Sequence, residues 1–467
     1  MGSETKRLLR IKALGLTCLL ALLTIVATSC NLALPGSQET PPTVGPTATL
    51  EPEPTKTPEP GITSLTFWEP FALDRPQGIL LSEMIRDFEE ENPDISVEIV
   101  PKSGYVGIHG SMMARLPGGE LPDLAVAFPS MIAEYAAAGV VAPLDAYIND
   151  PGLGFTETDI VDIFPGYLEA GRFPGHGRQI LAFPFSQNAI GMWVNETLLQ
   201  QAGWDHIPAT WAEFEQACFD VAAATGARCY PFVESVSTFN AWLYSRDGQQ
   251  LDPPGQRATF NGPPGVESLA LLRRLMDVGL AWRPEEPYGD YVAFANGQAA
   301  FTFSSTGNSQ LYLDAYDGAL RSGISPFRWR QTTIPQSDPA DPATALYGSS
   351  FFILQTDSAR QEAAWRLIRW FTDPQQTARW AAELQSMPVR LSALDWMTDT
   401  LEAYPFFRAQ VEEILPHGRP EPAVVGELEI RDILYTAILS VTQSLADPQA
   451  VLDQAARDAD AVLSGQR

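Results

Sequence analysis

Residues 88–97 read FEEENPDISV, and this stretch decides how the sequence around it folds. The Asn92-Pro93-Asp94 run stops a helix, because proline cannot continue a helix and restricts the backbone of the residue before it. Upstream, apolar residues recur at helical spacing over 74–91. Downstream, 95–100 alternates as a strand does, and 64–71 has the composition of a buried strand. The stretch therefore predicts a strand–helix–strand unit.

The same alternation continues along the chain. We expect a helix over about 107–116, a strand over 123–128 and a helix to 138, which together predict a doubly wound parallel sheet. Thr210 is a natural N-cap for a helix through 224, because its hydroxyl can accept a bond from a free first-turn amide. The last hundred residues are expected to be almost wholly helical. Further predicted strands cover 179–183, 190–194, 230–233, 299–303 and 351–354.

Residues 1–29 have the layout of a secretory signal, with basic residues before an uncharged apolar run over 13–26. At about 14 residues this run is shorter than the roughly 20 that a membrane-spanning helix needs. The small residues before Cys30 resemble a bacterial lipoprotein cleavage site, at which the cysteine becomes the lipidated first residue. We therefore expect an exported protein, anchored to the outer face of the cell membrane through Cys30. A plain signal peptidase cut nearby is the alternative.

Residues 31–61 hold eight prolines, six threonines and four glutamates, the composition of a semi-extended tether. We expect the tether to cover 30–61 and the globular part to begin near Ile62. About 400 residues then remain, more than one hydrophobic core usually supports, so two lobes are predicted. The net charge is −27 for the whole chain and −30 without residues 1–29, which hold four basic residues and one acidic residue. Such a charge repels nucleic acid and anionic lipid, so we expect no nucleic-acid partner, and we expect a monomer.

Two cysteines, Cys218 and Cys229, fall in the globular part. An exported protein meets an oxidising compartment, so we expect a disulfide that ties a helix to the strand after it. Two buried free thiols are the alternative.

Several segments, in this order, resemble the extracellular solute-binding proteins of bacterial ABC importers, in particular the group serving carbohydrates. Their order and spacing carry the resemblance, which covers nearly all of the chain from Ile62 onward. The segments are 66–68 (TFW), 88–97, 119–124 (GELPDL), 184–195 with 202–203 and 208–211, 294–301 (FANGQAAF) and 388–390 (PVR).

The resemblance implies an α/β, two-lobed fold of the periplasmic-binding-protein type (type II), in which each lobe is a sheet flanked by helices. Lobe 1 is expected to hold 62–187 and about 348–395, and lobe 2 about 188–347 and 396–467. The implied function is to capture a mono- or oligosaccharide in the cleft by lobe closure and deliver it to ABC permease subunits.

Candidate ligand-binding residues lie at strand ends, where doubly wound sheets bind ligands. A sugar stacks its C–H faces on aromatic rings and pairs its hydroxyls with amides or carboxylates. Trp68 and Glu69 end the first strand and suit a sugar, the alternative being a core tryptophan with a solvated glutamate. Phe128 and Ser130 follow a later strand. By the resemblance these two residues face the cleft.

Other candidates lie at the crossings between the lobes and in lobe 2. Phe185 and Asn188 belong to the first crossing, and Tyr347 and Ser349 to the return crossing. Of Phe239 and Trp242, one is expected in the cleft and the other in the core. Arg390 is either near the hinge or part of a structural salt bridge. A small polar loop, which could instead be only a helix cap, supplies Ser304, Ser305 and Asn308.

Other functions fit the residues less well. A secreted glycosidase needs two carboxylates about 5–10 Å apart, and no recognisable motif supplies them. The four histidines are isolated and no G-x-S-x-G elbow occurs, so we expect no catalytic residue, no metal and no cofactor. A sensory receptor would share the fold and differ only in its partner.

The cargo is inferred by elimination. A polyol phosphate would favour Arg or Lys at the strand ends, where only Arg390 is found. A polyamine would require several carboxylates, and only Glu69 offers itself. A neutral polyhydroxyl solute remains, with these two cargoes and a peptide as alternatives.

Overall fold

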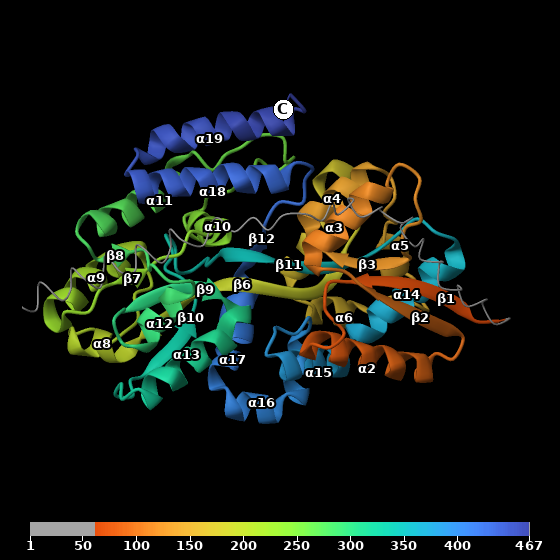
Figure 1. Ribbon diagram of the computed structural model, residues 1–467, viewed down its shortest axis with the longest axis horizontal. Coiled ribbons are helices and arrows are strands. Elements are labelled where there is room, and N and C mark those ends of the chain that lie inside the picture. The colour runs from red at the N-terminus through yellow and green to blue at the C-terminus, as the bar shows by residue number, and fades with distance from the viewer. Residues whose placement is uncertain (1–60, 467) are drawn as a thin grey trace, which may run out of the picture. The chain divides into compact units, whose positions relative to one another are not determined.

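The computed structural model describes residues 61–466 (Figure 1). The predicted signal, Cys30 and the predicted tether up to residue 60 lie outside the described residues. Within the described residues, no helix is both long enough and apolar enough to cross a membrane.

The predicted strand–helix–strand unit is confirmed as β1 (Thr63–Glu69), α2 (Pro76–Glu91) and β2 (Ile95–Pro101). The Asn92 amide still donates to the Phe88 carbonyl at 2.9 Å, and Pro93 then ends the helix. Strand β1 pairs with β2 in parallel, from Thr63 opposite Ile95 to Glu69 opposite Pro101. The next elements, α3 (Gly104–Arg115), β3 (Leu124–Ala127) and α4 (Pro129–Ala137), also lie close to their predicted ranges.

The three strands for which a parallel sheet was predicted do pair in parallel, β1 with both β2 and β3, but the sheet as a whole is mixed. The strand order is β10-β6-β11-β3-β1-β2, and β11 (Thr344–Ile353) runs antiparallel to both β3 and β6. Strand β6 (Phe183–Asn195) is one long strand, where the sequence predicted separate strands over 179–183 and 190–194. It stays continuous because its first part pairs with β11 and its last part with β9 (Phe301–Ser305) and β10 (Trp329–Thr332).

Strands β6 and β11 run across the middle of the body, between the part that holds β1–β3 and the part that holds β9 and β10 (Figure 1). The helices of the second part include α9 (Trp211–Thr225), which begins as predicted at the N-cap Thr210. A capping box joins the Thr210 hydroxyl and the Glu213 carboxylate to each other's backbone amides. The others in this part are α8 (Glu196–Gln201), α10 (Val236–Tyr244), α11 (Pro263–Asp277), α12 (Gly289–Ala295) and α13 (Ser309–Arg321).

The remaining elements cover the sheet and close the chain. Short ones follow α4: α5 (Asp145–Ile148), α6 (Glu157–Asp162), α7 (Pro165–Ala170), β4 (Arg172–Phe173) and β5 (Gln179–Ile180). Strand β7 (Tyr230–Pro231) pairs with β8 (Ala281–Trp282). The C-terminal elements are α14 (Ser358–Phe371), α15 (Pro374–Leu384), α16 (Thr398–Ala403), α17 (Pro405–Ala409), β12 (Gly418–Pro420), α18 (Glu427–Ser444) and α19 (Pro448–Leu463).

Two main hydrophobic cores form on either side of the crossing strands. The first contains Phe67, Phe88 and Trp365 and joins β1–β3 to α2, α14 and α15. The second contains Phe214 and Trp242 and joins β6 and β9 to α9, α10, α11 and α18. Apolar residues of 397–415 pack into the first core, although the sequence analysis assigned this segment to lobe 2. The lobe boundaries themselves stay a prediction.

Cys218 on α9 and Cys229, just before β7, form a disulfide inside the second core. It joins a helix to the strand that follows it along the chain.

Candidate functional site

A cavity of about 300 Å³ lies where the two cores meet along the crossing strands. Its floor includes Gln187 from β6 and Tyr347 from β11, which lie on neighbouring strands. One wall is the start of α4, and the opposite wall is formed by α10, α18 and the segment after β12. The lining residues are Phe128, Pro129, Ser130, Met131, Ala170, Gln187, Ser237, Leu346, Tyr347, Gly348, Pro420, Glu421, Pro422, Glu427, Leu428 and Arg431.

Local sequence explains how each wall is built. Pro129 occupies the first turn of α4, where proline is favoured, so the helix begins directly after β3. Phe128 and Ser130, on either side of Pro129, therefore lie at the cavity. Helix α18 begins after Gly426, whose φ of 84° is in the left-handed region that favours glycine. The Gly426 amide donates to a carboxylate oxygen of Glu134 on α4 at 2.8 Å, which links the start of α18 to α4.

A chain of hydrogen bonds, here called the carboxylate network, lies along the α10 and α18 wall. Gln250 donates to Glu427 at 2.7 Å, and Asn240 donates to Gln250 at 2.9 Å and to Glu421 at 3.0 Å. Arg431 donates to the other oxygen of Glu421 at 2.5 Å. It also donates to the hydroxyl of Ser237 at 3.2 Å. Its members are Glu427, Gln250, Asn240, Glu421, Arg431 and Ser237.

The electrostatics of this wall follow from burial. Glu427 is 1 % exposed, and burial raises its pKa to about 8. Burial alone would lower the pKa of Arg431, but the charges of Glu421 and Glu427 outweigh it and raise that pKa. On the floor, burial raises the pKa of Tyr347 to about 12, so its hydroxyl keeps its proton. The wall can therefore offer both donors and acceptors to a polar solute.

Three of the predicted site residues line the cavity: Phe128, Ser130 and Tyr347. The Phe128 ring packs on Tyr105, with 4.6 Å between ring centroids, and the Tyr105 hydroxyl lies 2.9 Å from the hydroxyl oxygen of Ser349. The predicted residue Ser349 thus lies behind the ring that faces the cavity.

The predicted polar loop lies beside the floor. Ser305 hydrogen-bonds the Tyr347 hydroxyl, and Asn308 donates to Ser304 at 3.1 Å and to the Tyr291 hydroxyl at 2.8 Å. Thr306 donates to the side-chain oxygen of Asn188 at 3.4 Å. The structure therefore brings the loop and the first crossing together, next to the cavity residue Tyr347.

Glu69 and Trp68 are placed differently from the prediction of a sugar-facing pair. Glu69 is fully buried, its carboxylate accepts the Phe71 amide at 2.5 Å, and burial raises its pKa to about 7. Trp68 is 5 % exposed in an apolar cluster on β1 and β3. Lys102 Nζ lies 4.0 Å from the ring centroid of Trp68 and covers a face that a sugar would need. For Trp68, the alternative of a core tryptophan fits the structure.

Three predicted aromatic residues are packed in cores, away from the cavity lining. Phe185 lies 4.8 Å from Phe351 and 5.1 Å from Trp380 between ring centroids. Phe239 and Trp242 are both buried in the second core, where one of the two was expected to face the cleft. Ser237 and Asn240, three positions apart on α10, are the residues of this helix that reach the cavity and the carboxylate network, respectively.

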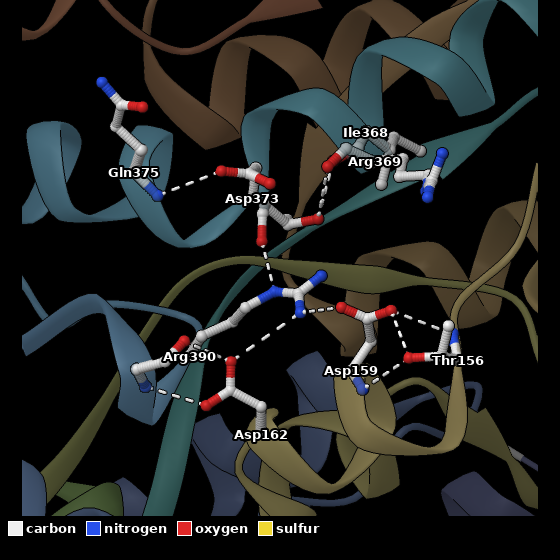
Figure 2. A network of polar contacts seen from close by, with 10 residues as sticks. Thr156, Asp159, Asp162, Ile368, Arg369, Asp373, Gln375 and Arg390 are labelled. Carbon is white, nitrogen blue, oxygen red and sulfur yellow. Dashed lines mark hydrogen bonds and ion pairs between the residues drawn. The ribbon is translucent and has the colours of Figure 1, made fainter. Parts of the chain in front are cut away.

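Arg390 forms a structural ion-pair network away from the cavity lining, which is the alternative that the sequence left open. Figure 2 shows its guanidinium between Asp159 and Asp162, at 2.8 Å and 3.7 Å from their carboxylate oxygens. The Nε atom of Arg390 also donates a hydrogen bond of 2.6 Å to the Thr372 carbonyl. Burial alone would raise the pKa of Asp159, but hydrogen bonds from Thr156 and Arg390 outweigh it and lower that pKa to about 2.

The sequence analysis missed the residues of the opposite wall: Ser237, Asn240, Gln250, Glu421, Glu427 and Arg431. Glu427 and Arg431 stand four apart, a spacing typical of a solvated helix pair, so they carried no signal of a site. The only available signal was Gly426, which marks the start of the helix that presents them. Within residues 61–466, no group of three or more His, Cys, Asp or Glu side chains is placed to hold a metal ion.

Comparison with known proteins gives consistent matches. The family described as bacterial extracellular solute-binding protein matches residues 83–409. A Brucella abortus (strain 2308) protein, described as a binding protein, is 23 % identical over 398 residues, which cover 83 % of this chain and 90 % of that one.

Solved structures match over most of their length. The sugar-binding protein MalE from Xanthomonas citri has a TM-score of 0.74 at 20 % identity, covering 87 % of this chain and 98 % of that one. The cyclic alpha-maltosyl-1,6-maltose binding protein from Arthrobacter globiformis has a TM-score of 0.70 at 22 % identity, covering 87 % and 100 %. This likeness shows that the chain has the same mixed α/β, periplasmic-binding-protein fold.

Proposed function

The chain belongs to the bacterial extracellular solute-binding proteins, and from this premise we propose that it captures a carbohydrate for an ABC importer. The solute is a mono- or short oligosaccharide, which the protein passes unchanged to membrane permease subunits. The two solved structures of the same fold, named as sugar-binding proteins, support this cargo.

The observation that carries the proposal is the composition of the cavity. Its walls come from opposite sides of the crossing strands, and they combine the Phe128 ring with hydroxyl, carboxylate and guanidinium groups. A sugar needs this combination, because its C–H faces pack on rings while its hydroxyls require donors and acceptors together. A volume of about 300 Å³ is at the lower end for ligand pockets, which favours a solute of one or two sugar units.

The same arrangement supports a closing movement. A solute that contacts α4 on one side and α18 on the other stabilises the conformation in which both walls approach it. The crossing strands β6 and β11 connect the two sides and would bend as the hinge. The permease would then recognise the closed form.

Export and anchoring are part of the proposal. The signal-like residues 1–29 and the small residues before Cys30 support a lipoprotein held at the outer face of the membrane by a tether. Mass spectrometry of the protein from its membrane fraction tests this step. A diacylglycerol-modified Cys30 at the mature N-terminus is expected, and an unmodified N-terminus elsewhere would contradict it.

The cargo is tested by thermal unfolding of the purified protein against a panel of mono-, di- and trisaccharides. A sugar present at about 100 times its Kd stabilises the folded state by about 2.7 kcal/mol, which raises the melting temperature by several degrees. Chromatography of the released sugar should show it chemically unchanged. A panel that leaves the melting temperature unmoved, while another class of solute raises it, would overturn the carbohydrate assignment.

Variants locate the binding in the cavity. Phe128→Ala should reduce the thermal shift that the sugar produces, because the ring is lost from the cavity wall. Glu402→Gln on α16 is the control, since this exposed side chain lies outside the cavity lining. Equal shifts for the two variants would place the sugar elsewhere.

A further inference from the structure

In the part of the chain that the structure describes, buried oxygen atoms without a hydrogen-bond partner line the cavity or lie beside it. Of the lining residues, Gln187 and Glu427 each have a buried oxygen without a partner among residues 61–466: Gln187 Oε1 and Glu427 Oε2. The side-chain oxygen of Asn240, next to Glu421 in the carboxylate network, is buried and unpartnered as well. Buried polar atoms usually have partners, so the two free oxygens of the lining residues favour a ligand that donates hydrogen bonds.

The amide orientations that make these atoms acceptors are fixed by their neighbours. The Gln187 amide nitrogen must face the Ser349 carbonyl at 3.1 Å, because two acceptors cannot bond each other. The Asn240 nitrogen must face the Glu421 carboxylate for the same reason, and the Gln250 nitrogen must face Glu427. The unpartnered atoms are therefore carbonyl or carboxyl oxygens.

The charges at the cavity are unequal. Among its lining residues, Glu421 and Arg431 form an ion pair that cancels, and Glu427 has no cationic partner of its own within hydrogen-bonding distance. Within residues 61–466, the Glu427 side chain accepts its one hydrogen bond from the neutral amide of Gln250. A single carboxyl group with a free oxygen thus faces a solute from the α18 wall.

We propose that the solute carries a protonated amine on its polyhydroxyl body, as an amino sugar does, and that the amine binds Glu427 Oε2. An ammonium group donates three hydrogen bonds and accepts none, which matches Gln187 Oε1 and the ionised form of Glu427, whose free oxygens are acceptors. A hydroxyl would donate only one hydrogen bond and would carry no charge to pair with the carboxylate. The inference rests on the proposed function, because it specifies the carbohydrate that the same cavity takes.

The proposal changes one step of the sequence analysis. A cationic cargo was set aside there because the candidate segments offered only Glu69. The fold brings Glu421 and Glu427 to the cavity, while Glu69 lies outside its lining. The carboxylates that a cationic group requires are therefore present, from a part of the chain that carried no signal.

The experiment measures Kd by calorimetry for three matched sets of sugars. Each set holds an amino sugar, its N-acetyl form and the neutral parent: the glucosamine, galactosamine and mannosamine sets. In at least one set the amino sugar should bind about tenfold more tightly than both relatives, because a hydrogen bond between charged groups replaces a neutral one. Glu427→Gln should remove this preference, since it presents an amide N–H₂ group to the amine. Glu402→Gln should keep it.

The outcomes separate the two proposals. Neutral sugars that bind as tightly as amino sugars would overturn the amine and leave the carbohydrate function standing. Binding of spermidine, an amine without hydroxyls, in the absence of any sugar binding would overturn both. Amine preference that survives in Glu427→Gln would overturn the role of Glu427.

A second measurement needs no variant. Glu427 is held protonated by burial, and an ammonium bound to it stabilises the carboxylate, so binding should release protons near pH 7. The titratable groups that interact with Glu427 are Glu421, Arg431 and Tyr244, and Glu134 of α4 accepts the amide of the preceding residue, Gly426. Calorimetry in two buffers of different ionisation enthalpy should show net proton release for amino sugars and none for neutral parents. Equal proton release for both would overturn the proposal.

Discussion

The Gln250 side chain donates a hydrogen bond of 2.7 Å to Glu427, a residue 177 positions further along the chain. This bond joins the segment after α10 to the first turn of α18 and leaves the second oxygen of Glu427 at the cavity. Burial disfavours the charged carboxylate of Glu427 more than the hydrogen bond from Gln250 favours it, so the pKa of Glu427 is raised to about 8.

Glu427→Gln should change how stability depends on pH. The folded-state pKa of about 8 lies above the ordinary value of 4.5, so folding holds a proton that the unfolded chain releases between these values. The free energy of unfolding of the native protein therefore falls as the pH rises from about 4.5 to about 8, relative to the variant. Urea unfolding across this range checks it, with Glu402→Gln as control. If the difference in the free energy of unfolding between the native protein and Glu427→Gln stayed constant with pH, the raised pKa of Glu427 would be contradicted.

Tyr347→Phe should weaken solute binding with little loss of stability. Tyr347 lines the cavity and its hydroxyl is hydrogen-bonded by Ser305, so the substitution removes one polar group from the floor while the ring remains. A lost hydrogen bond of about 1 kcal/mol corresponds to a Kd increase of roughly fivefold to tenfold. Calorimetry with the sugar that gives the largest thermal shift measures it. Tyr435→Phe, on the exposed face of α18, should leave the Kd unchanged.

Arg390→Met should lower stability and leave solute affinity unchanged. Arg390 is 3 % exposed, and its guanidinium bridges Asp159, Asp162 and the Thr372 carbonyl, none of which lines the cavity. Removing one partner of a buried ion pair costs up to about 3–5 kcal/mol, and less here because Asp159 is partly exposed. Thermal unfolding and calorimetry on the same sample separate the two effects. A weaker Kd without loss of stability would restore Arg390 as a site residue.

Trp68→Ala should destabilise the protein by about 3–5 kcal/mol, the usual cost of removing a buried aromatic side chain. Trp396→Ala is the matched control, because that ring is 61 % exposed and its loss should cost less than about 0.5 kcal/mol. Guanidinium unfolding measures both. If Trp68→Ala kept its stability and lost only solute binding, the ring would belong to the site after all.

The sequence predicted the local elements because their signals are local. Pro93 ends α2, and Thr210 with Glu213 starts α9, through interactions between residues a few positions apart. The family resemblance then supplied the two-sided architecture that these elements alone do not determine. Its prediction of crossing strands agrees with β6 and β11, which pair across more than 150 residues of sequence.

The site was predicted on one wall only, for a physical reason. Phe128 and Ser130 follow a strand that the sequence identifies, so their position at its end could be inferred. Glu427 and Arg431 look like an ordinary helix pair, and their position depends on how α18 packs against α4 and α10. The same limit applies to Phe185 and Trp242, which were site candidates from the sequence but pack in the two cores. An aromatic residue near a crossing fits a core and a binding site equally well.

Gly348→Ala should impair the floor of the cavity. Gly348 has a φ of 153°, and an added Cβ would lie 2.2 Å from the Ser186 carbonyl oxygen on the neighbouring strand. The strands would have to separate beside Tyr347 and Gln187, so we expect a loss of about 1–3 kcal/mol in stability together with weaker solute binding. Gly110→Ala is the control, since that glycine lies inside α3 with open space around the added atom. It should instead stabilise the protein by about 0.4–1 kcal/mol. Unfolding and calorimetry of both variants test the contrast, and a Gly348→Ala protein with native stability and affinity would show that the floor tolerates strand separation.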